Sequence, residues 1–149
     1  MARASMDANS ATAAVTALLS TYCHTADGDD VDAWLACFAA EGTFTSETPS
    51  GEQRLLLTGH EQMREWFETT YKVANPVGTQ THVTANALVR VSDPDHAEGT
   101  STYLTVKAGD DGPVINSVGT YTDRYVRGED GAWRFEYRRA VATMRRTVT

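Results

Sequence analysis

The fold is decided by the stretch His24–Gly42, which reads HTADGDDVDAWLACFAAEG. One helix is expected to end within it at Asp27 and a second to begin a few residues later. Gly28 is a natural helix stop, and Asp29 or Asp30 can accept the free amide hydrogens of the next helix as its N-cap. An aspartate at a helix C-terminus faces the negative end of the helix dipole, at a cost of about 0.3–1 kcal/mol where it is exposed. We therefore expect Asp27 to be present for its chemistry.

Apolar residues on both sides of this stretch recur with helical spacing. The upstream stripe predicts a helix that begins near Ser10 and is formed by Val15, Leu18, Leu19 and Tyr22. The downstream stripe predicts a second helix that ends at Gly42 and is formed by Val31, Trp34, Leu35 and Phe38. Together they predict a tight helical hairpin. Residues 1–10 are small and polar, so we expect them to be disordered.

The rest of the chain predicts one short strand, a third helix and a meander of long strands. The strand covers residues 43–48, and the helix opens at Gly59 and ends before Asn75-Pro76. The hydrophobic period then changes from helical to alternating over four segments, which are 80–92, 97–108, 114–127 and 132–147. Turn-forming Asp, Gly and Pro residues separate them, and short turns join antiparallel neighbours. The prediction is an α+β fold in one domain, residues 11–149.

Composition excludes several classes of partner. The chain has 149 residues, 20 acidic and 13 basic side chains, and a net charge of -7, which disfavours nucleic acids and anionic membranes. Cys23 and Cys37 lack the spacing of a metal or redox motif, so we interpret them as buried thiols in a reducing compartment. There is no signal-peptide pattern and no apolar run of membrane-spanning length. We expect a cytoplasmic protein.

Three titratable residues lie where a curved sheet would face the helical hairpin: Asp27, His82 and Tyr22. Strict alternation puts His82 on the polar side of its strand, which by itself predicts a solvent-facing residue. A functional role requires either that this polar side lines a cavity or that a β-bulge exchanges the faces near Ala85. Tyr22 lies about 140° from Asp27 around an ideal helix, so core packing is its simpler interpretation.

The last segment carries one basic residue on its apolar side. Arg139 shares the parity of Trp133, Phe135 and Tyr137, so either a bulge or a snorkelling stem turns it outward, or it forms a cation at a pocket rim. Metal-ligand spacings, glycine-rich phosphate loops and nucleophile elbows are all missing from the sequence. We expect neither a metal nor a cofactor.

Several short motifs, each weak alone, together resemble the SnoaL-like superfamily in type and order. They begin with Tyr22, Asp27, Asp30, Trp34, Phe38 and Glu41-Gly42, continue with Leu57-Thr-Gly59-His-Glu61 and Thr81-His82-Val83-Thr-Ala-Asn86, and end with Gly119-Thr-Tyr121-Thr-Asp123-Arg-Tyr125 and Asp130-Gly131-Ala-Trp133-Arg-Phe135. The resemblance covers nearly the whole chain and is to the branch that includes scytalone dehydratase and hexachlorocyclohexane dehydrochlorinase. It implies a cone-shaped, strongly curved antiparallel sheet that wraps helices around a deep, mostly apolar pocket.

The resemblance also implies a catalytic dyad. In both named relatives an aspartate at the end of the first helix orients a histidine on the following sheet, and Asp27 and His82 match those positions. Such a carboxylate fixes the imidazole tautomer and leaves the other ring nitrogen free to act as a base.

The chain also departs from scytalone dehydratase at several pocket positions. Ala26 and Ser46 stand where that enzyme has tyrosines, and residues 97–108 contain no counterpart of its second histidine. Its polar pair would fall near Thr120 and Thr122. Scytalone is therefore not the expected substrate, and the acid that protonates a leaving group is unassigned.

The implied function is that of a cofactor-independent lyase, a dehydratase or cyclase acting on a small apolar oxygenated ring compound such as a polyketide intermediate. The candidate substrate contacts are Tyr22, Trp34, Asn86, Thr120 and Arg139. One alternative is an isomerase or hydrolase using the same pocket. Another is a non-catalytic ligand-binding or assembly module resembling the β subunit of ring-hydroxylating dioxygenases. A homodimer or homotrimer is expected, because a curved sheet leaves one broad outer face.

Overall fold

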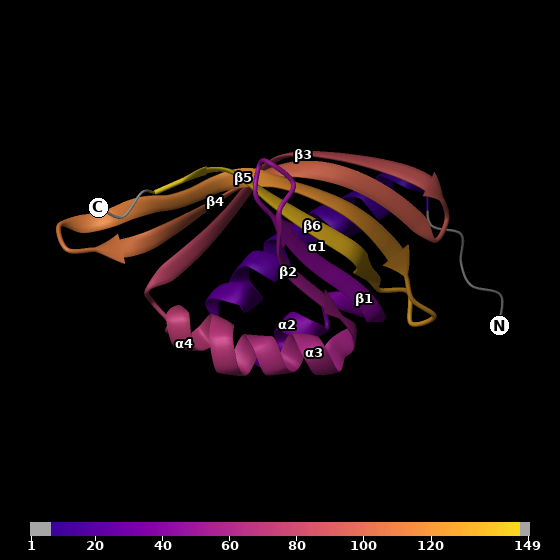
Figure 1. Cartoon of the computed structure of the whole chain (residues 1–149). Helices are drawn as coiled ribbons and strands as arrows, with labels where there is room; N and C mark the ends of the chain where they lie inside the picture. The colour runs from indigo at the N-terminus through magenta and orange to yellow at the C-terminus, as the bar shows by residue number, and fades with distance from the viewer. Residues whose placement is uncertain (1–6, 147–149) are drawn as a thin grey trace.

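A computed structural model describes residues 7–146, which form a curved, unclosed sheet with the helices on its concave side (Figure 1). The order of elements is α1 (Ala8–Asp27), α2 (Val31–Leu35), β1 (Phe38–Glu47), β2 (Gln53–Thr58), α3 (Gly59–Trp66), the π-helical η1 (Phe67–Tyr71), α4 (Lys72–Ala74), β3 (Gln80–Asp93), β4 (His96–Gly109), β5 (Gly112–Arg127) and β6 (Trp133–Arg145). The α+β prediction is confirmed. None of the helices within residues 7–146 is long and apolar enough to cross a bilayer.

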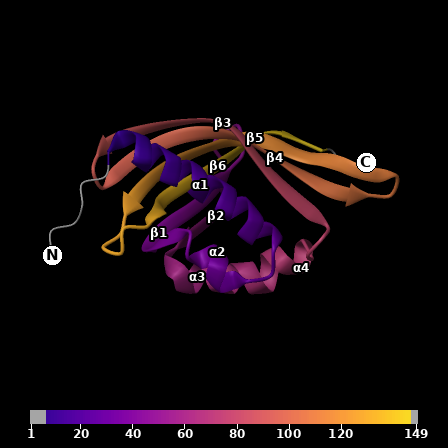
Figure 2. The same cartoon turned by 180° about the vertical axis from the view of Figure 1, so that it is seen from behind.

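The six strands lie in the order β2-β1-β6-β5-β4-β3. The pair β1 and β6 is parallel, and all the other pairs are antiparallel. The predicted meander corresponds to β3 to β6, and β3 forms one edge of the sheet. Helix α1 packs against β3, so the first helix covers the concave side close to that edge (Figure 2).

Helix α1 begins earlier than the sequence predicted. Asp7 is its N-cap and accepts a hydrogen bond from the Ser10 amide at 2.8 Å, so Ala8 is already helical. The prediction of disorder is therefore wrong for residues 8–10, while residues 1–6 lie outside the described part of the chain. The helix ends at Asp27 as expected, where the Gly28 amide donates to the His24 carbonyl at 3.1 Å.

The second helix is shorter than predicted. It ends at Leu35, and the expected continuation to Gly42 is wrong, because Phe38 is already the first residue of β1. Phe38 pairs with Phe135 of β6 and is fully buried. Sheet pairing and burial thus override the helical spacing that Phe38 shares with Val31 and Trp34.

Strand β2 was not predicted from the sequence. The sequence assigned no element to residues 53–58, but they pair with β1 from Thr43↔Thr58 to Glu47↔Gln53. The third helix occupies its expected span but is divided in three, because the π-helical η1 separates α3 from α4.

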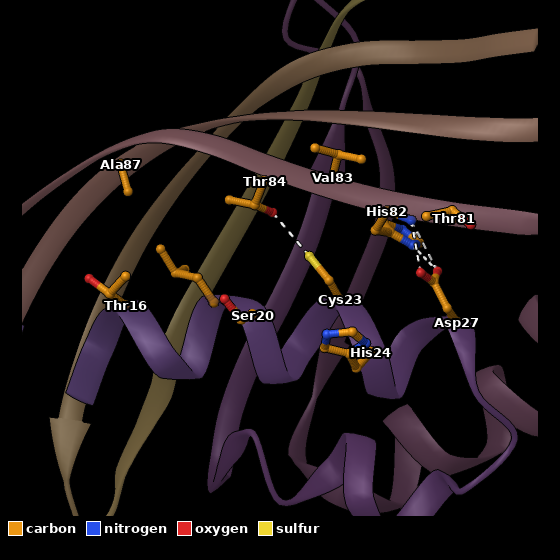
Figure 3. A pocket seen from close by; sticks show the side chains of 11 residues that line it. Thr16, Ser20, Cys23, His24, Asp27, Thr81, His82, Val83, Thr84 and Ala87 are labelled. Carbon is orange, nitrogen blue, oxygen red and sulfur yellow. Dashed lines mark hydrogen bonds and ion pairs between the residues drawn. The ribbon is translucent and has the colours of Figure 1, made fainter. Parts of the chain in front are cut away.

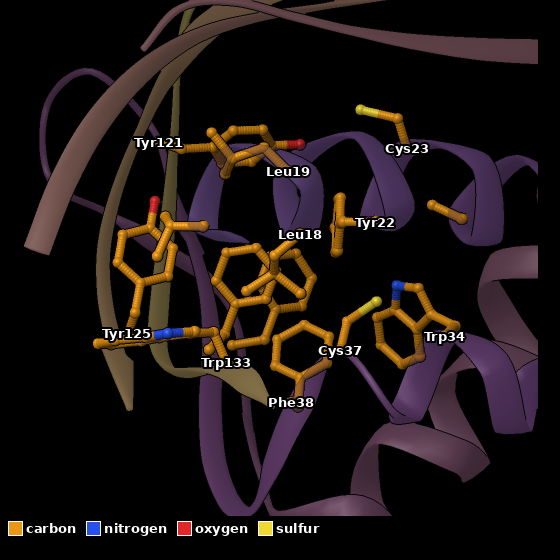
Figure 4. Packing of buried hydrophobic residues seen from close by; sticks show 14 of the residues in the cluster. Leu18, Leu19, Tyr22, Cys23, Trp34, Cys37, Phe38, Tyr121, Tyr125 and Trp133 are labelled. Atoms are coloured by element: carbon orange, nitrogen blue, oxygen red, sulfur yellow. The ribbon is translucent and has the colours of Figure 1, made fainter. Parts of the chain in front are cut away.

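The core beneath the sheet is rich in aromatic side chains (Figure 4). Trp34 is 1% exposed and stacks on Phe67 with ring centroids 4.8 Å apart. Tyr22 packs edge-on against Phe38, Phe135 and Tyr121. Aromatic packing therefore joins α1, α2 and η1 to the sheet, and Trp34 links most of these elements.

Replacing Trp34 by Ala should lower the free energy of unfolding by about 3–5 kcal/mol, because it leaves a cavity against Phe67 and Phe38. Urea denaturation followed by circular dichroism measures this change. Val73 is 71% exposed, so Val73→Ala serves as the control, with an expected effect below about 0.5 kcal/mol. A loss under about 1 kcal/mol for Trp34→Ala would contradict the assigned core position.

Candidate active site

The side of β3 that carries His82 faces the helices. His82 and Thr84 are partly buried, whereas Thr81 and Val83 are exposed. Beyond Ala85 the pairing with β4 shifts by one residue, so the alternation of buried and exposed residues along β3 is reversed. The polar side of the first half of β3 therefore lines the groove beside α1, and a bulge exchanges the faces as the sequence required for a functional His82.

The C-terminus of α1 brings Asp27 against His82. The Asp27 Oδ1 atom lies 2.7 Å from His82 Nδ1, and Oδ2 accepts the His82 backbone amide at 2.9 Å (Figure 3). A carboxylate only accepts hydrogen bonds, so Nδ1 carries the hydrogen in this contact. The exposed fractions are 8% for the His82 side chain and 22% for Asp27. The pair is thus largely shielded from water, and the tautomer leaves Nε2 as the basic nitrogen.

A groove of about 480 Å³ runs along this pair between α1 and β3. It is lined by Thr16, Leu19, Ser20, Cys23, His24, Asp27, Thr81, His82, Val83, Thr84 and Ala87 (Figure 3). Cys23 Sγ lies 3.2 Å from Thr84 Oγ1 and bridges the two walls. On the side that faces the core, the His82 imidazole packs against the rings of Tyr22 and Tyr71, with ring centroids 6.3 and 6.4 Å away. The dyad therefore lies between a solvent-accessible groove and the aromatic core.

A second bulge brings a cation into that core. The bulged residue is Glu136. On β5 the consecutive residues Arg124 and Tyr125 pair with Tyr137 and Phe135 of β6, so Glu136 between them has no partner on β5. Phe135 and Arg138 are consequently both fully buried. The sequence alternation had placed Arg138 on the wet face, which is wrong, because it assumed an unbroken strand.

The Arg138 guanidinium is enclosed by aromatic rings. Its central carbon lies 3.5 Å from the Tyr121 ring centroid, 4.2 Å from that of Tyr22 and 4.3 Å from that of Phe135. Asp123 is its counter-ion, with Oδ1 at 3.4 Å from Arg138 Nε, and Tyr125 donates to Asp123 Oδ2 at 3.0 Å. Among residues 7–146 none of the three guanidinium nitrogens has a hydrogen-bond acceptor. The aromatic faces and the charge of Asp123 are therefore what compensates this buried cation.

Burial is the main cause of the pKa shifts in this cluster. Burial raises the pKa of the Asp123 carboxyl above its usual range, against the opposing influence of Arg138. Burial also raises the pKa of Tyr22 to about 12, so its phenol keeps the proton at neutral pH. Tyr22 contacts both His82 and Arg138 and lies between the base and the cation.

The five predicted substrate contacts have different positions. Tyr22 and Trp34 belong to the buried core, at 4% and 1% exposure, and Tyr22 is the one that touches the dyad histidine. Asn86 is exposed at the β3 bulge, with φ 55°, and does not line the groove. The structure thus leaves Tyr22 as the predicted contact beside the dyad.

Two of the predicted contacts lie on the outer face of the sheet. Thr120 is exposed, and its neighbour Tyr121 points inward instead. Arg139 Nη2 pairs with Glu47 Oε2 at 2.6 Å and is 38% exposed, so the bulge that brings Arg138 inward turns Arg139 outward. Neither residue lines the groove, and for Arg139 the structure has the predicted alternative of a bulge that turns it outward.

Arg138 is the residue that the sequence reasoning missed. One signal for it exists, because Asp123 shares the apolar parity of Tyr121 and Tyr125 on β5, and a buried carboxylate needs a buried cation. Residues 7–146 contain no cluster of three or more metal-binding side chains. The groove thus presents the Asp27–His82 pair, while Arg138 and the Tyr22 phenol lie behind it in the core.

Comparison with known proteins identifies the fold. The sequence matches the SnoaL-like domain family over residues 8–139. The chain belongs to this family. A search of curated proteins gave no significant match. Among solved structures, Rv3472 from Mycobacterium tuberculosis, described as a protein of unknown function, is 28% identical with a TM-score of 0.74, and the alignment covers 89% of this chain and 71% of that one.

Two other solved structures share the fold and have different functions. The hexachlorocyclohexane dehydrochlorinase LinA-type3 from Novosphingobium barchaimii is 15% identical, with a TM-score of 0.76 and coverage of 95% of this chain and 92% of that one. A protein from Novosphingobium aromaticivorans, assigned as the β subunit of an aromatic-ring-hydroxylating dioxygenase, is 18% identical, with a TM-score of 0.76 and 95% coverage of both chains. The same fold therefore serves a lyase and an assembly subunit, and the site residues must decide between them.

Arg138→Met should lower the free energy of unfolding at neutral pH by about 3–5 kcal/mol, because it leaves Asp123 buried without its counter-ion. The double variant Arg138→Met with Asp123→Leu should recover most of that loss, since it removes both charges. Urea denaturation of the two single variants and the double variant gives the coupling free energy between Arg138 and Asp123. Strictly additive losses would show that the two charges do not interact.

Alkaline pH should unfold the protein as its buried tyrosines ionise. The pKa of Tyr22 is raised to about 12 by burial, and burial also raises those of Tyr71, Tyr103, Tyr121 and Tyr125. The unfolded chain releases these protons near pH 10, so the stability they provide is complete below pH 10 and is lost as the pH rises towards 12. For Tyr22 the difference is on the order of 3 kcal/mol.

Phenolate absorbance and near-ultraviolet circular dichroism, recorded together against pH, test this expectation. Both should change in one cooperative step. Tyr22→Phe should move the step to higher pH, because that variant lacks one of the ionising groups. Gradual ionisation of these tyrosines in a folded protein would contradict their buried positions.

Proposed function

We propose that this protein is a cofactor-independent lyase, a dehydratase or cyclase, in which the Asp27–His82 dyad removes a proton from carbon. The substrate class is a small oxygenated ring compound, such as a polyketide intermediate, whose acidic C–H lies next to a carbonyl or aromatic group. The observation that carries the proposal is the 2.7 Å contact between Asp27 Oδ1 and His82 Nδ1 beside a groove.

The dyad has the geometry of a general base. Asp27 holds the Nδ1–H tautomer and stabilises the imidazolium that forms when Nε2 takes a proton. Because the His82 side chain is only 8% exposed, this charge separation is weakly screened by water. Proton abstraction by such an oriented base contributes about 10²–10⁴ to a rate.

The buried guanidinium supports the second half of the reaction. Loss of a proton from carbon leaves negative charge on the substrate, first on an activating oxygen and then on the departing group. Arg138 is separated from the dyad by the single ring of Tyr22, which contacts both. Neither Arg138 nor Tyr22 lines the groove, so the cation acts on this charge only through its electric field across the Tyr22 ring, which the dry surroundings screen weakly.

The likeness to a dioxygenase β subunit favours a second candidate, a non-catalytic ligand-binding or assembly module. In that function the Asp27–His82 contact would only fasten α1 to the sheet edge. An isomerase or hydrolase remains an alternative within the enzyme class, because the same base can return its proton elsewhere or activate water. Analysis of the products separates these reactions.

Deuterium uptake from solvent provides a test that needs no complete turnover. The wild-type protein, incubated in D₂O with a panel of ring ketones and hydroxylated aromatic ketones, should exchange the acidic C–H of at least one compound. Asp27→Asn and His82→Gln should slow that exchange by about 10²-fold or more, because the base loses its orientation or is removed. Proton NMR of the compound measures the exchange.

Asp110→Asn is the matched control, since it removes an equal charge in the exposed turn between β4 and β5, away from the groove, and should leave the exchange unchanged. Exchange that proceeds equally fast in Asp27→Asn would falsify the dyad mechanism. Binding of panel compounds without any exchange in the wild type would favour the binding module instead.

A further inference from the structure

The end of α1 is held by a third group in addition to the two contacts with His82. The last carbonyls of a helix have no partners within the helix, and their negative partial charge opposes a carboxylate placed beside them. The Ala26 carbonyl, directly before Asp27, accepts a hydrogen bond from Lys72 Nζ at 2.7 Å. The ammonium group therefore neutralises the helix end at the residue preceding the dyad aspartate.

Lys72 reaches this position from α4, of which it is the first residue. Its Nζ atom lies 5.4 Å from the Phe67 ring centroid and 5.2 Å from the Tyr71 ring centroid. Burial lowers the pKa of Lys72, while Asp27 and Asp29, the two carboxylates that act on it, oppose this effect. The ammonium is thus held by aromatic faces on one side and by the α1 terminus on the other.

The π-helical η1 turn accounts for the direction of this lysine. Relative to a continuous α-helix, a π-helical turn contains an extra residue, which rotates everything after it by about 100° around the axis. Lys72 is the first residue after η1, and Tyr71, the last residue within it, meets the His82 ring. Of these two consecutive residues, Tyr71 therefore contacts His82, and Lys72 contacts Ala26, the residue directly before Asp27.

We propose that Lys72 is a positioning residue for the dyad, which fixes the last turn of α1 so that the Asp27 carboxylate stays in contact with His82. The functional meaning of this role rests on the proposed function, whereas the contact itself does not. Without the ammonium, the last carbonyls of α1 lack a cation that compensates their negative partial charge. The repulsion between these carbonyls and the Asp27 carboxylate then destabilises the helix end. The last turn then frays, and the imidazole loses the group that fixes its tautomer.

The test compares Lys72→Met with Lys72→Gln and Lys72→Arg. Lys107→Met, which removes the other lysine of the chain, is the matched control. The first readout is the His82 tautomer from its imidazole ¹⁵N chemical shifts. The second is amide hydrogen exchange at His82, whose N–H is bonded by Asp27, and at Gly28, whose N–H closes the last turn of α1.

The wild type should show the Nδ1–H tautomer and slow exchange at both amides. Lys72→Met should give mixed tautomers and roughly fivefold faster exchange at these two amides, with no change for amides in the middle of β5. Lys72→Arg should restore both signals, because it keeps the cation. Lys72→Gln gives the same comparison with a donor but no charge, and it replaces Lys72→Met if that variant does not fold.

Two results would overturn the proposal. One is an unchanged His82 tautomer in both uncharged variants, and the other is faster exchange of all amides alike, which would mean that Lys72 only supports general stability. Neither readout uses a substrate, so failure here is distinct from failure of the deuterium-uptake test. A dyad that stays oriented by Lys72 but exchanges no C–H would contradict the proposed function alone.

Discussion

The carboxylate of Asp27 accepts hydrogen bonds both from a backbone amide at the sheet edge and from the His82 imidazole. The arrangement of the site depends on this double contact. Strand β3 lies at the edge, so the His82 amide has no strand partner on its outer side. Asp27 accepts that amide with one oxygen and the ring nitrogen with the other. Because Asp27 is the last residue of α1, these bonds also fasten the helix across the edge strand, so that structural support and chemical orientation come from one side chain.

The interior behind this contact combines aromatic packing with charge. Arg138 and Asp123 are both fully buried, which is costly unless the charges compensate each other. The rings of Tyr22, Tyr121 and Phe135 reduce that cost for the guanidinium by presenting their negative faces. Among residues 7–146 the Arg138 nitrogens have no hydrogen-bond acceptor, so the aromatic rings and the charge of Asp123 provide its compensation.

Two β-bulges decide which residues face the helices. On β3 the bulge after Ala85 allows His82 and Thr84 to face inward while Val89 and Val91 are also partly buried further along the same strand. On β6 the extra residue Glu136 brings Arg138 in. A bulge changes the register by one residue, and the side-chain period of a strand is two, so every residue beyond it changes face.

Local patterns were sufficient for the α+β class, for α1 with Asp27 at its end, for the span of the third helix and for the four long strands. They failed where distant pairing decided the outcome. Phe38 has helical spacing but pairs with Phe135, and residues 53–58 become a strand because β1 offers them a partner.

The sequence by itself determined that a helix ends at Asp27 and that a later strand carries His82, because helix stops and strand alternation are local properties. Their pairing was implied only by the resemblance to the SnoaL-like family, since the two residues are far apart in the chain. The tertiary structure decided which charges are inside, since the bulges that bury Arg138 and expose Arg139 depend on the register of neighbouring strands. It also decided what neutralises the end of α1, because Lys72 lies 46 residues from Ala26 in the chain and meets it only after η1 has turned it toward the helix.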